Sequence, residues 1–304
     1  MCIRDRHKIV FPEEIIEELR KDDNVILVLR GKYKYWNSDS MFMESCQLVD
    51  TLKSGGPNMK GESAKRLCVV FPKEGYVKQD KIFKDDCEKT ILGESLSVAT
   101  QRKVLKSLGA DLMISLYPHD FRLPEDGEGW IKTEYQNWTN FVWAINPVKV
   151  IPEYFRKKNI HIDLVVAPDR GAYDFSEYIA NKLGAECSYI DSHRSREDCN
   201  IVMTKNDLCK DLSGKSILIP DDWILAGGKT KNAIKFLKPE GQKEKWPKEI
   251  HIAVIHGEMN GNAYEELMER NIKLYYTNSV ENPAGVIDVT IIMADRIKKL
   301  FLDG

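Results

Sequence analysis

The stretch from Ser216 to Lys238 holds the residues whose types and spacing are best suited to chemistry. A short apolar run is followed by two adjacent carboxylates, Asp221 and Asp222, and then by the glycine pair Gly227 and Gly228. An amphipathic pattern typical of a helix comes next. A strand, an acidic pair, a glycine turn and a helix, in that order, present backbone N–H groups and the positive end of a helix to an anion. The carboxylates before the turn suit a ligand that also carries hydroxyl groups, such as a sugar phosphate.

Taken alone, this stretch leaves a second interpretation open. An ordinary strand-to-helix turn with an acidic rim has the same order of residue types. The spacing is not that of a Walker loop, because no Gly-x4-Gly-Lys pattern is present. The surrounding chain therefore has to decide between the two.

Length and composition exclude several classes of protein. The chain has 304 residues, enough for one large domain or for two of about 150 residues each. Hydrophobic residues make up 42% and charged residues 30%, and the formal net charge is −2. This balance argues against a disordered or fibrous chain and against a nucleic-acid partner. No apolar run approaches the roughly 18 residues of a membrane helix, so no membrane partner is expected.

The seven cysteines are far apart, and none forms a Cys-x-x-Cys pair. An odd, scattered set of this kind is typical of reduced thiols in a cytoplasmic protein. It argues against a zinc site and against a disulfide framework.

Apolar runs and helical patterns alternate along the chain. Expected strands occupy residues 24–29, 67–71, 111–116, 162–167, 186–190, 217–219, 250–255 and 273–276. Expected helices occupy residues 41–53, 91–108, 174–183, 229–238, 263–270 and 289–301. This alternation predicts an α/β protein with mostly parallel sheets flanked by helices. A connection rich in Gly, Pro and Trp at 123–147 separates two similar halves, and a polar loop is expected between residue 190 and Leu212.

In this setting, the stretch from Ser216 to Lys238 resembles the phosphoribosyl-diphosphate loop of ribose-phosphate diphosphokinases and their phosphoribosyltransferase relatives. That loop reads as two acids, two apolar residues, a third acid, Thr, Gly, Gly, Thr. The acidic pair and the glycine pair match it, whereas Leu225, Ala226 and Lys229 stand where the third acid and both threonines would be.

A second segment, Gly75–Lys81, is a charged surface loop when considered alone. Beside the family pattern it resembles Gly-Tyr-Ala-Arg-Gln-Asp-Arg, which is part of the family's ATP site. The matching residues are Lys78, Gln79, Asp80 and Lys81, with two Arg-to-Lys changes. Lysine keeps the positive charge but loses the planar fork of arginine. Phe11 resembles the start of the family's adenine segment. Since a strand and a helix precede that segment in the family, the chain is expected to lack its native N-terminus.

The resemblance also implies a magnesium site. His119 follows an expected strand and matches the family's metal-binding histidine, although Tyr117 replaces the usual neighbouring aspartate. Asp169 matches the aspartate of the family's Ser-Pro-Asp turn, which is also near metal. Taken alone, His119 would be a packed or solvated side chain. Magnesium prefers oxygen ligands and keeps waters, so few protein ligands are expected.

A third segment, Tyr189–Arg196, resembles a mobile loop that carries a Lys and an Arg in the family. In the family these two cations close over the transferring phosphoryl group. Ser192 stands at the lysine position and Arg194 at the arginine position, so one of the two positive charges is missing. His193 and Arg196, in the same segment, are the candidates to compensate. The resemblance therefore implies a slow enzyme, while the alternative is a polar loop without chemistry.

The family's activity follows as an expectation. Two phosphoribosyltransferase-like domains, residues 7–148 on the ATP side and 149–288 on the ribose-phosphate side, would have the active site between them, and helix 289–304 would pack back on the first. Diphosphate would pass from ATP to ribose 5-phosphate with Mg²⁺. The acidic pair would hold ribose hydroxyls, and the residues from Ala226 through Thr230, Lys229 included, would hold the 5-phosphate. A homo-oligomer, dimeric or larger, is implied.

Two alternatives to this activity remain open. The departures at Leu225, Ala226, Lys229, Tyr117 and Ser192 favour a non-catalytic homologue that binds nucleotides or sugar phosphates and regulates a true synthetase. A salvage phosphoribosyltransferase would use only the second domain's fold. The ATP-site resemblance at 75–81 argues against it.

Overall fold

The computed structural model describes residues 23–30, 38–55, 63–76, 96–119, 127–132, 137–194, 201–204, 212–268 and 272–303. These residues form two compact units. One contains the residues up to Ile145 together with those from Ile292 onward, and the other runs from Asn146 to Ile291. The domain boundaries at 148 and 288 stay a prediction.

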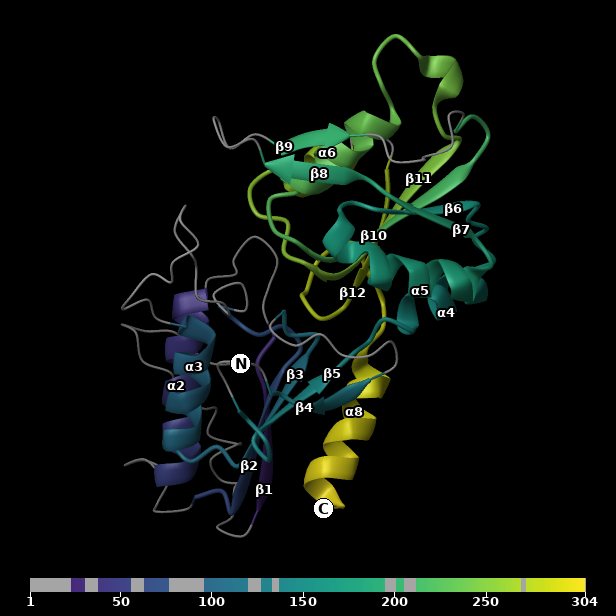
Figure 1. Cartoon of the computed structure of the whole chain (residues 1–304). Coiled ribbons are helices and arrows are strands. Elements are labelled where there is room, and N and C mark those ends of the chain that lie inside the picture. Colours follow the sequence, from purple (N-terminus) through teal and green to yellow (C-terminus); the bar gives the residue numbers. More distant parts are fainter. Residues whose placement is uncertain are drawn as a thin grey trace. The chain divides into compact units, whose positions relative to one another are not determined.

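The first unit is built on a five-stranded sheet with the order β1-β2-β3-β5-β4. Its strands are β1 (Asn24–Val28), β2 (Arg66–Phe71), β3 (Leu112–Leu116), β4 (Glu128–Trp130) and β5 (Val142–Ile145). All neighbouring pairs are parallel except β4–β5, which is antiparallel. Helices α2 (Ser38–Ser54) and α3 (Ser97–Ser107) lie together on one face of this sheet (Figure 1).

The core of the first unit lies between these two helices and the sheet. Leu48, Val49 and Leu52 of α2 are buried against Leu67 and other residues of the sheet, at the spacing expected of one helix face. The burial of every residue of β3 is typical of a parallel strand covered on both faces.

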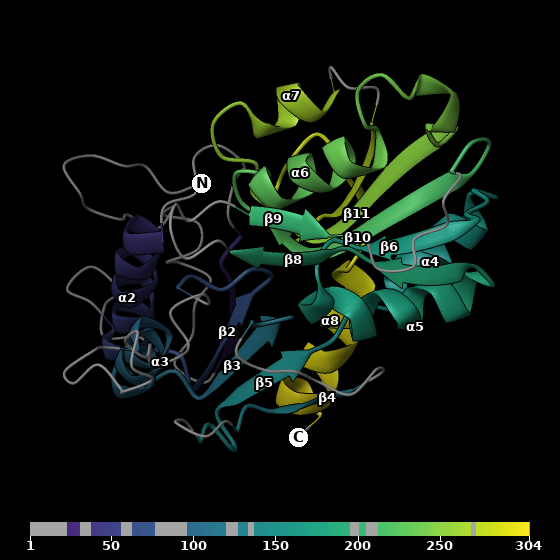
Figure 2. The same cartoon turned by 45° about the horizontal axis from the view of Figure 1, so that its top comes forward.

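The chain's last helix belongs to this first unit. Helix α8 (Thr290–Ile297) continues into a π-helical turn, Lys298–Leu302. The guanidinium of Arg66 lies 4.7 Å from the ring centroid of Phe301 and donates a 2.9 Å hydrogen bond to its carbonyl oxygen. Arg296 also forms an ion pair with Glu128 of β4. In both Figure 1 and Figure 2, α8 lies on the side of the sheet opposite to α2 and α3.

The second unit is built on a six-stranded, fully parallel sheet with the order β13-β12-β11-β10-β6-β7. Its strands are β6 (Leu164–Ala167), β7 (Glu186–Tyr189), β10 (Ser216–Ile224), β11 (Glu249–Gly257), β12 (Lys273–Thr277) and β13 (Gly285–Ile287). Its helices are α4 (Val150–Lys157), α5 (Tyr173–Leu183), α6 (Gly228–Leu237) and α7 (Ala263–Met268). Figure 2 shows α6 and α7 on one face of this sheet and α4 and α5 on the other.

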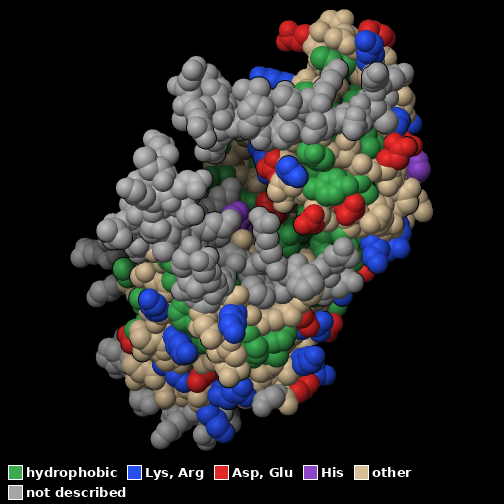
Figure 3. Space-filling model, in the orientation of Figure 1, with side chains coloured by type: hydrophobic (Ala, Val, Ile, Leu, Met, Phe, Trp, Pro, Cys, Tyr) green, Lys and Arg blue, Asp and Glu red, His purple; other side chains and the backbone are tan. Residues whose placement is uncertain are grey.

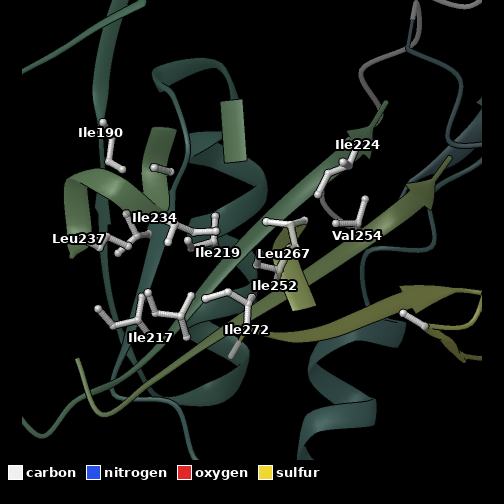
Figure 4. Close-up of a cluster of buried hydrophobic side chains, with 14 of the residues drawn as sticks. Ile190, Ile217, Ile219, Ile224, Ile234, Leu237, Ile252, Val254, Leu267 and Ile272 are labelled. Atoms are coloured by element: carbon white, nitrogen blue, oxygen red, sulfur yellow. The ribbon is translucent and has the colours of Figure 1, made fainter. Parts of the chain in front are cut away.

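Alternation along the central strands explains the two layers of helices. Ile217, Ile219, Ile252 and Val254 point into one cluster with α6 and α7, which is drawn in Figure 4. Their buried neighbours point to the opposite face, because successive side chains of a strand alternate. Each strand is therefore apolar on both sides.

The order of the strands creates a reversal beside β10. From β6 the chain moves outward to β7, and it then returns to the other side of β6 to form β10, β11, β12 and β13 in sequence. The reversal lies between β6 and β10. Open α/β sheets bind ligands outside the carboxyl ends of the strands at such a point.

The structure confirms the α/β fold class and differs from the expected elements in several places. The connection at 123–147 contains β4 and β5, and α4 was not expected. The expectation of a polar loop after residue 190 is wrong for Asp191–Arg194. These residues form strand β8, which pairs antiparallel with β9 (Ile201–Thr204).

Within the described residues, no helix is both long and apolar enough to cross a membrane. Lysines and arginines are interspersed with aspartates and glutamates over the coloured part of the face in Figure 3. Within that coloured part, no large area carries a single charge, in line with the net charge of −2.

Candidate functional site

The acidic pair lies at the carboxyl end of β10, beside the reversal in the sheet. The strand continues through both acids to Ile224, so it is longer than the apolar run indicated. The Asp221 side chain is only 3% exposed, and Asp222 is half-buried. Asp221 Oδ1 accepts a 3.0 Å hydrogen bond from the backbone N–H of Asp222.

The glycine turn connects this strand to α6. Gly227 has φ 70° and ψ 10°, a left-handed conformation that glycine adopts without steric cost. No side chain caps the start of α6, and a Cβ on Gly228 would meet nothing within 4 Å. The first N–H groups of a helix have no partner within the helix. The turn therefore leaves the N–H groups of Gly228 and its neighbours accessible to an anion.

Asp169 lies at the carboxyl end of β6, the strand that neighbours β10. It precedes a short 3-10 turn, Arg170–Ala172, and its Oδ1 accepts a 3.0 Å hydrogen bond from the N–H of Ala172. This bond holds the carboxylate at the same edge of the sheet as the acidic pair. The resemblance in sequence related Asp169 only to a metal site, whereas the strand order places it beside the acidic pair.

Lys229 connects the two carboxylates. Its Nζ donates to Asp169 Oδ2 at 3.0 Å and to Asp221 Oδ1 at 3.1 Å. The Lys229 side chain is 31% exposed and that of Asp169 30%. The expected contact of Lys229 with a phosphate stays a prediction, since an ammonium has three N–H donors and these two contacts use two of them.

Burial and charge shift the pKa values of this cluster. Burial raises the pKa of Asp221 to about 8, with a further rise from the charge of Asp222, while Lys229 acts in the opposite direction. Burial acts to lower the pKa of Lys229, but the charges of Asp221 and Asp169 outweigh it and the pKa is raised. Lys229 is therefore a permanent cation at neutral pH.

One atom of the cluster is left without a partner. Asp221 Oδ2 is buried and makes no hydrogen bond with any described residue. A buried oxygen without a partner costs free energy, and a hydroxyl donor from a ligand would remove that cost. The atom therefore needs a hydrogen-bond donor at this edge of the sheet, from a water or from a polar ligand.

The first unit contains a buried polar cluster that the sequence did not reveal. Arg102 of α3 donates from Nε and Nη2 to the two carboxylate oxygens of Glu74, both at 2.8 Å. Ser115 at the end of β3 donates to Glu74 Oε2 at 2.9 Å. The side chains of Arg102 and Glu74 are fully buried. Glu74 immediately precedes the segment from Gly75 to Lys81, so this cluster fixes the backbone where that segment begins.

The remaining predicted residues have limited structural description. His119 lies in the turn after β3 and is half-buried. Arg194 and His193 belong to β8, of which only the backbone is described. Phe11 and the ATP-segment residues Lys78, Gln79, Asp80 and Lys81 lie outside the described residues.

A magnesium site at Asp169 does not fit this arrangement. Asp169 Oδ1 accepts a hydrogen bond from the Ala172 N–H, and Oδ2 accepts one from the Lys229 ammonium, whose positive charge repels a second cation. Within the described residues, no group of three or more His, Cys, Asp and Glu side chains gathers that could hold a metal ion, although magnesium itself needs fewer protein ligands. A magnesium role for Asp169 would need Lys229 to move.

Comparison with known proteins agrees with this geometry. The family described as phosphoribosyl transferase domain matches residues 133–291. The ribose-phosphate pyrophosphokinase of Sulfurisphaera tokodaii is 30% identical over 276 residues, which cover 90% of this chain and 83% of the relative. The enzyme of the same name from Pyrococcus furiosus is 30% identical over 277 residues, covering 91% and 86%.

A solved structure shares the fold of the whole chain. It is the crystal structure of phosphoribosylpyrophosphate synthetase from Mycobacterium smegmatis, with a TM-score of 0.69 and 22% sequence identity. The match covers 98% of this chain and 87% of that one.

Proposed function

Since the chain belongs to the ribose-phosphate pyrophosphokinase family, we propose that it transfers the diphosphate group of ATP to ribose 5-phosphate. The products are 5-phosphoribosyl 1-diphosphate and AMP. The observation that carries this proposal is the acidic pair and the uncapped start of α6 at the reversal of the second sheet. The acidic pair suits the hydroxyls of a sugar, and the start of α6 suits its phosphate.

The reaction is a substitution at phosphorus. The oxygen of the anomeric hydroxyl forms a bond to the β-phosphorus of ATP and loses its proton. The bond between that phosphorus and the oxygen bridging to the α-phosphate breaks, and AMP leaves with the bonding electrons. Such transfers depend mainly on positioning and on neutralising charge, so the protein's part is to hold two anionic substrates in line.

The second unit is proposed to hold ribose 5-phosphate. Asp222 and the unpartnered Oδ2 of Asp221 accept hydrogen bonds from the ribose hydroxyls. Backbone N–H groups from Ala226 to Thr230 donate to the 5-phosphate, assisted by the positive end of α6. The third N–H of the Lys229 ammonium is a further donor to that phosphate.

The first unit is proposed to take ATP, with Phe11 against adenine and Lys78–Lys81 along the phosphates. Magnesium enters as part of the MgATP substrate, and His119 is the proposed protein contact for it. The reaction takes no step through a metal at Asp169, because the Lys229 ammonium lies 3.0 Å from its Oδ2 and repels a second cation. Arg194, with His193, is proposed to supply positive charge to the transferring group.

Detection of AMP tests the proposal. The protein is incubated with ATP, Mg²⁺ and ribose 5-phosphate, AMP is measured by a coupled assay, and the sugar product by ³¹P NMR. Formation of both products in equal amounts, and only when ribose 5-phosphate is present, is the expected result. Binding of both substrates by calorimetry without formation of AMP would instead identify a non-catalytic, regulatory homologue.

A further inference from the structure

Three elements of the second unit converge on one ammonium group. Asp169 follows β6, Asp221 is the first of the two acids of β10, and Lys229 lies in the first turn of α6. Asp169 and Lys229 are 60 residues apart in sequence, so the contact depends on the neighbouring positions of β6 and β10. The cluster is a property of the fold and of the reversal in the sheet.

Ionisation of both carboxyl groups requires a cation between them. Like charges at a shared site disfavour each other's ionised form, and the cost is greater for a buried group. Asp221 is almost fully buried, and Asp169 is held in place by the N–H of Ala172. A cation that contacts both oxygens offsets this repulsion, and Lys229 is the residue that does so, at 3.0 and 3.1 Å.

A divalent ion and this ammonium group cannot occupy the same position. Magnesium binds oxygen at about 2.0–2.1 Å and would need the Asp169 Oδ2 and Asp221 Oδ1 atoms that now accept hydrogen bonds from Nζ. Lys229 reaches these two oxygens from helix α6, which packs on the hydrophobic core of the second unit through Ala233 and Ile234. The backbone of Lys229 is therefore fixed in α6, and its ammonium group is held by Asp169 and Asp221.

We propose that the Lys229 ammonium is a built-in cation that takes the place of a divalent metal ion between Asp169 and Asp221. The sugar-phosphate half of the site then carries its positive charge permanently. The second unit then binds its sugar phosphate without a metal ion at Asp169, a consequence that rests on the proposed function. Because a lysine side chain replaces a metal ion that could dissociate, the site does not depend on free divalent ions. The contact with Lys229 also keeps Asp221 Oδ2 directed at the ligand.

Binding of Mn²⁺ alone tests this inference without any substrate. Free Mn²⁺ is measured by its EPR signal during titration of the wild-type protein and of the Lys229→Met variant. We expect Lys229→Met to gain one site at least about tenfold tighter than any the wild type has in this region, since two carboxylates then face each other without a cation. Adding Asp169→Asn to Lys229→Met should remove the gained site.

Two control variants separate this effect from a general loss of charge. Lys229→Arg keeps a cation at the position and should gain no Mn²⁺ site. Lys231→Met removes a neighbouring lysine of α6 that pairs with Glu266 at 2.6 Å, and should gain none either. Equal gains in Lys229→Met and Lys231→Met would overturn the inference.

If Lys229→Met fails to fold, Mn²⁺ binding by the single variant Asp169→Asn tests the inference instead. In the wild-type background, Asp169→Asn should leave Mn²⁺ binding unchanged, because Asp169 is not a metal ligand while Lys229 is in place. Weaker Mn²⁺ binding in Asp169→Asn would overturn the inference. Since neither ATP nor ribose 5-phosphate is present, these results are independent of whether the protein makes AMP.

Discussion

The backbone of Gly257 packs directly against the ring of Tyr276. A Cβ at Gly257 would lie 2.8 Å from Tyr276 Cγ and closer still to Cδ2, distances that real Cβ atoms do not show. The ring cannot move easily, because Tyr276 is fully buried and its hydroxyl donates to Met259 Sδ at 3.4 Å. Gly257 also pairs with Ile224, the last residue of β10, so this contact supports the strand that carries the acidic pair.

The first prediction is that Gly257→Ala lowers the free energy of unfolding by about 1–3 kcal/mol, the usual cost of overpacking a core. Urea denaturation followed by circular dichroism measures it. The control is Gly129→Ala, since a Cβ at Gly129 would meet nothing within 4 Å. That variant should stay within about 0.5 kcal/mol of wild type. Equal losses in the two variants would contradict the close packing of Gly257 on Tyr276.

The second prediction concerns the buried ion pair of the first unit. Arg102→Met removes both guanidinium donors from the Glu74 carboxylate, which is fully buried. Removing one partner of a buried pair leaves an uncompensated charge and costs roughly 3–5 kcal/mol. Urea denaturation should show a loss of this size, or failure to fold.

The neighbouring Lys103 provides the matched control for Arg102. It lies in the same helix, is exposed, and Lys103→Met makes the same change to methionine. Surface substitutions of this kind usually change stability by less than about 0.5 kcal/mol. If Arg102→Met costs no more than Lys103→Met, the Arg102–Glu74 pair does not hold α3 to the end of β2.

The third prediction is that Asp222→Ala weakens binding of ribose 5-phosphate more than binding of ATP. Hydrogen bonds from hydroxyls to a carboxylate contribute about 1.5–3 kcal/mol each, or roughly tenfold to hundredfold in Kd. Calorimetry with each ligand measures the two affinities. Glu186→Ala is the control, because Glu186 lies at the amino end of β7, at the opposite edge of the same sheet. Equal losses for both ligands in Asp222→Ala would remove Asp222 from the sugar site.

The fourth prediction is a pH dependence of stability that depends on Asp221. Burial raises its pKa to about 8 in the folded protein, against about 3.9 for an unfolded aspartate. The folded state therefore binds the proton more tightly. The resulting stabilisation is fully present below about pH 4 and is lost as the pH rises through about 8.

Comparison of the wild type with Asp221→Asn isolates this dependence. The free energy of unfolding of the wild type minus that of the variant should fall steadily between about pH 5 and 8, because asparagine does not titrate there. Urea denaturation at several pH values measures the difference. A difference that stays constant between about pH 5 and 8 would mean that Lys229 keeps Asp221 ionised in the folded protein across this range.

The sequence predicted the parts of the fold that depend on local pattern. The apolar run of Ile217 to Ile219 and the alternation of strands with helices indicated a covered parallel sheet, and the structure confirms it. Helix α4 was missed because Pro152 reads as a helix breaker, although proline is tolerated in the first turn, where its missing N–H has no partner to lose. β8 was missed because its four residues are mostly polar and lack an apolar alternation.

The contacts within the candidate site could not be read from local pattern. Lys229 and Asp169 meet only because β10 lies beside β6, and that strand order is a long-range property. Arg102 looked like one more charged residue of an amphipathic helix, and its burial depends on Glu74, 28 residues earlier. The sequence indicated the acidic pair and the glycine turn as a candidate site, which stays a prediction. It did not identify which cation would neutralise the acids.

The last prediction concerns the antiparallel ribbon of β8 and β9. Strand β8 begins at Asp191, directly after the carboxyl end of β7 and the buried Ile190. The ribbon therefore leaves the sheet at the edge where the acidic pair lies. Arg194 is the last residue of β8, and its backbone pairs with Ile201. A cation carried on such a ribbon is well suited to approach a transferring phosphoryl group.

Arg194→Ala should lower the rate of AMP formation by about 10²–10³, which corresponds to roughly 2.7–4 kcal/mol of transition-state stabilisation. The Kd for ATP should change little, because a contact made only in the transition state affects turnover alone. Arg194→Lys keeps the charge without the planar fork and should retain an intermediate rate. Arg156→Ala, at an exposed arginine of α4, is the control and should leave turnover unchanged. Turnover is measured by the AMP assay and ATP affinity by calorimetry. A rate in Arg194→Ala equal to that of Arg156→Ala would place Arg194 outside the reacting site and leave the Lys229 cluster as the main source of positive charge in the second unit.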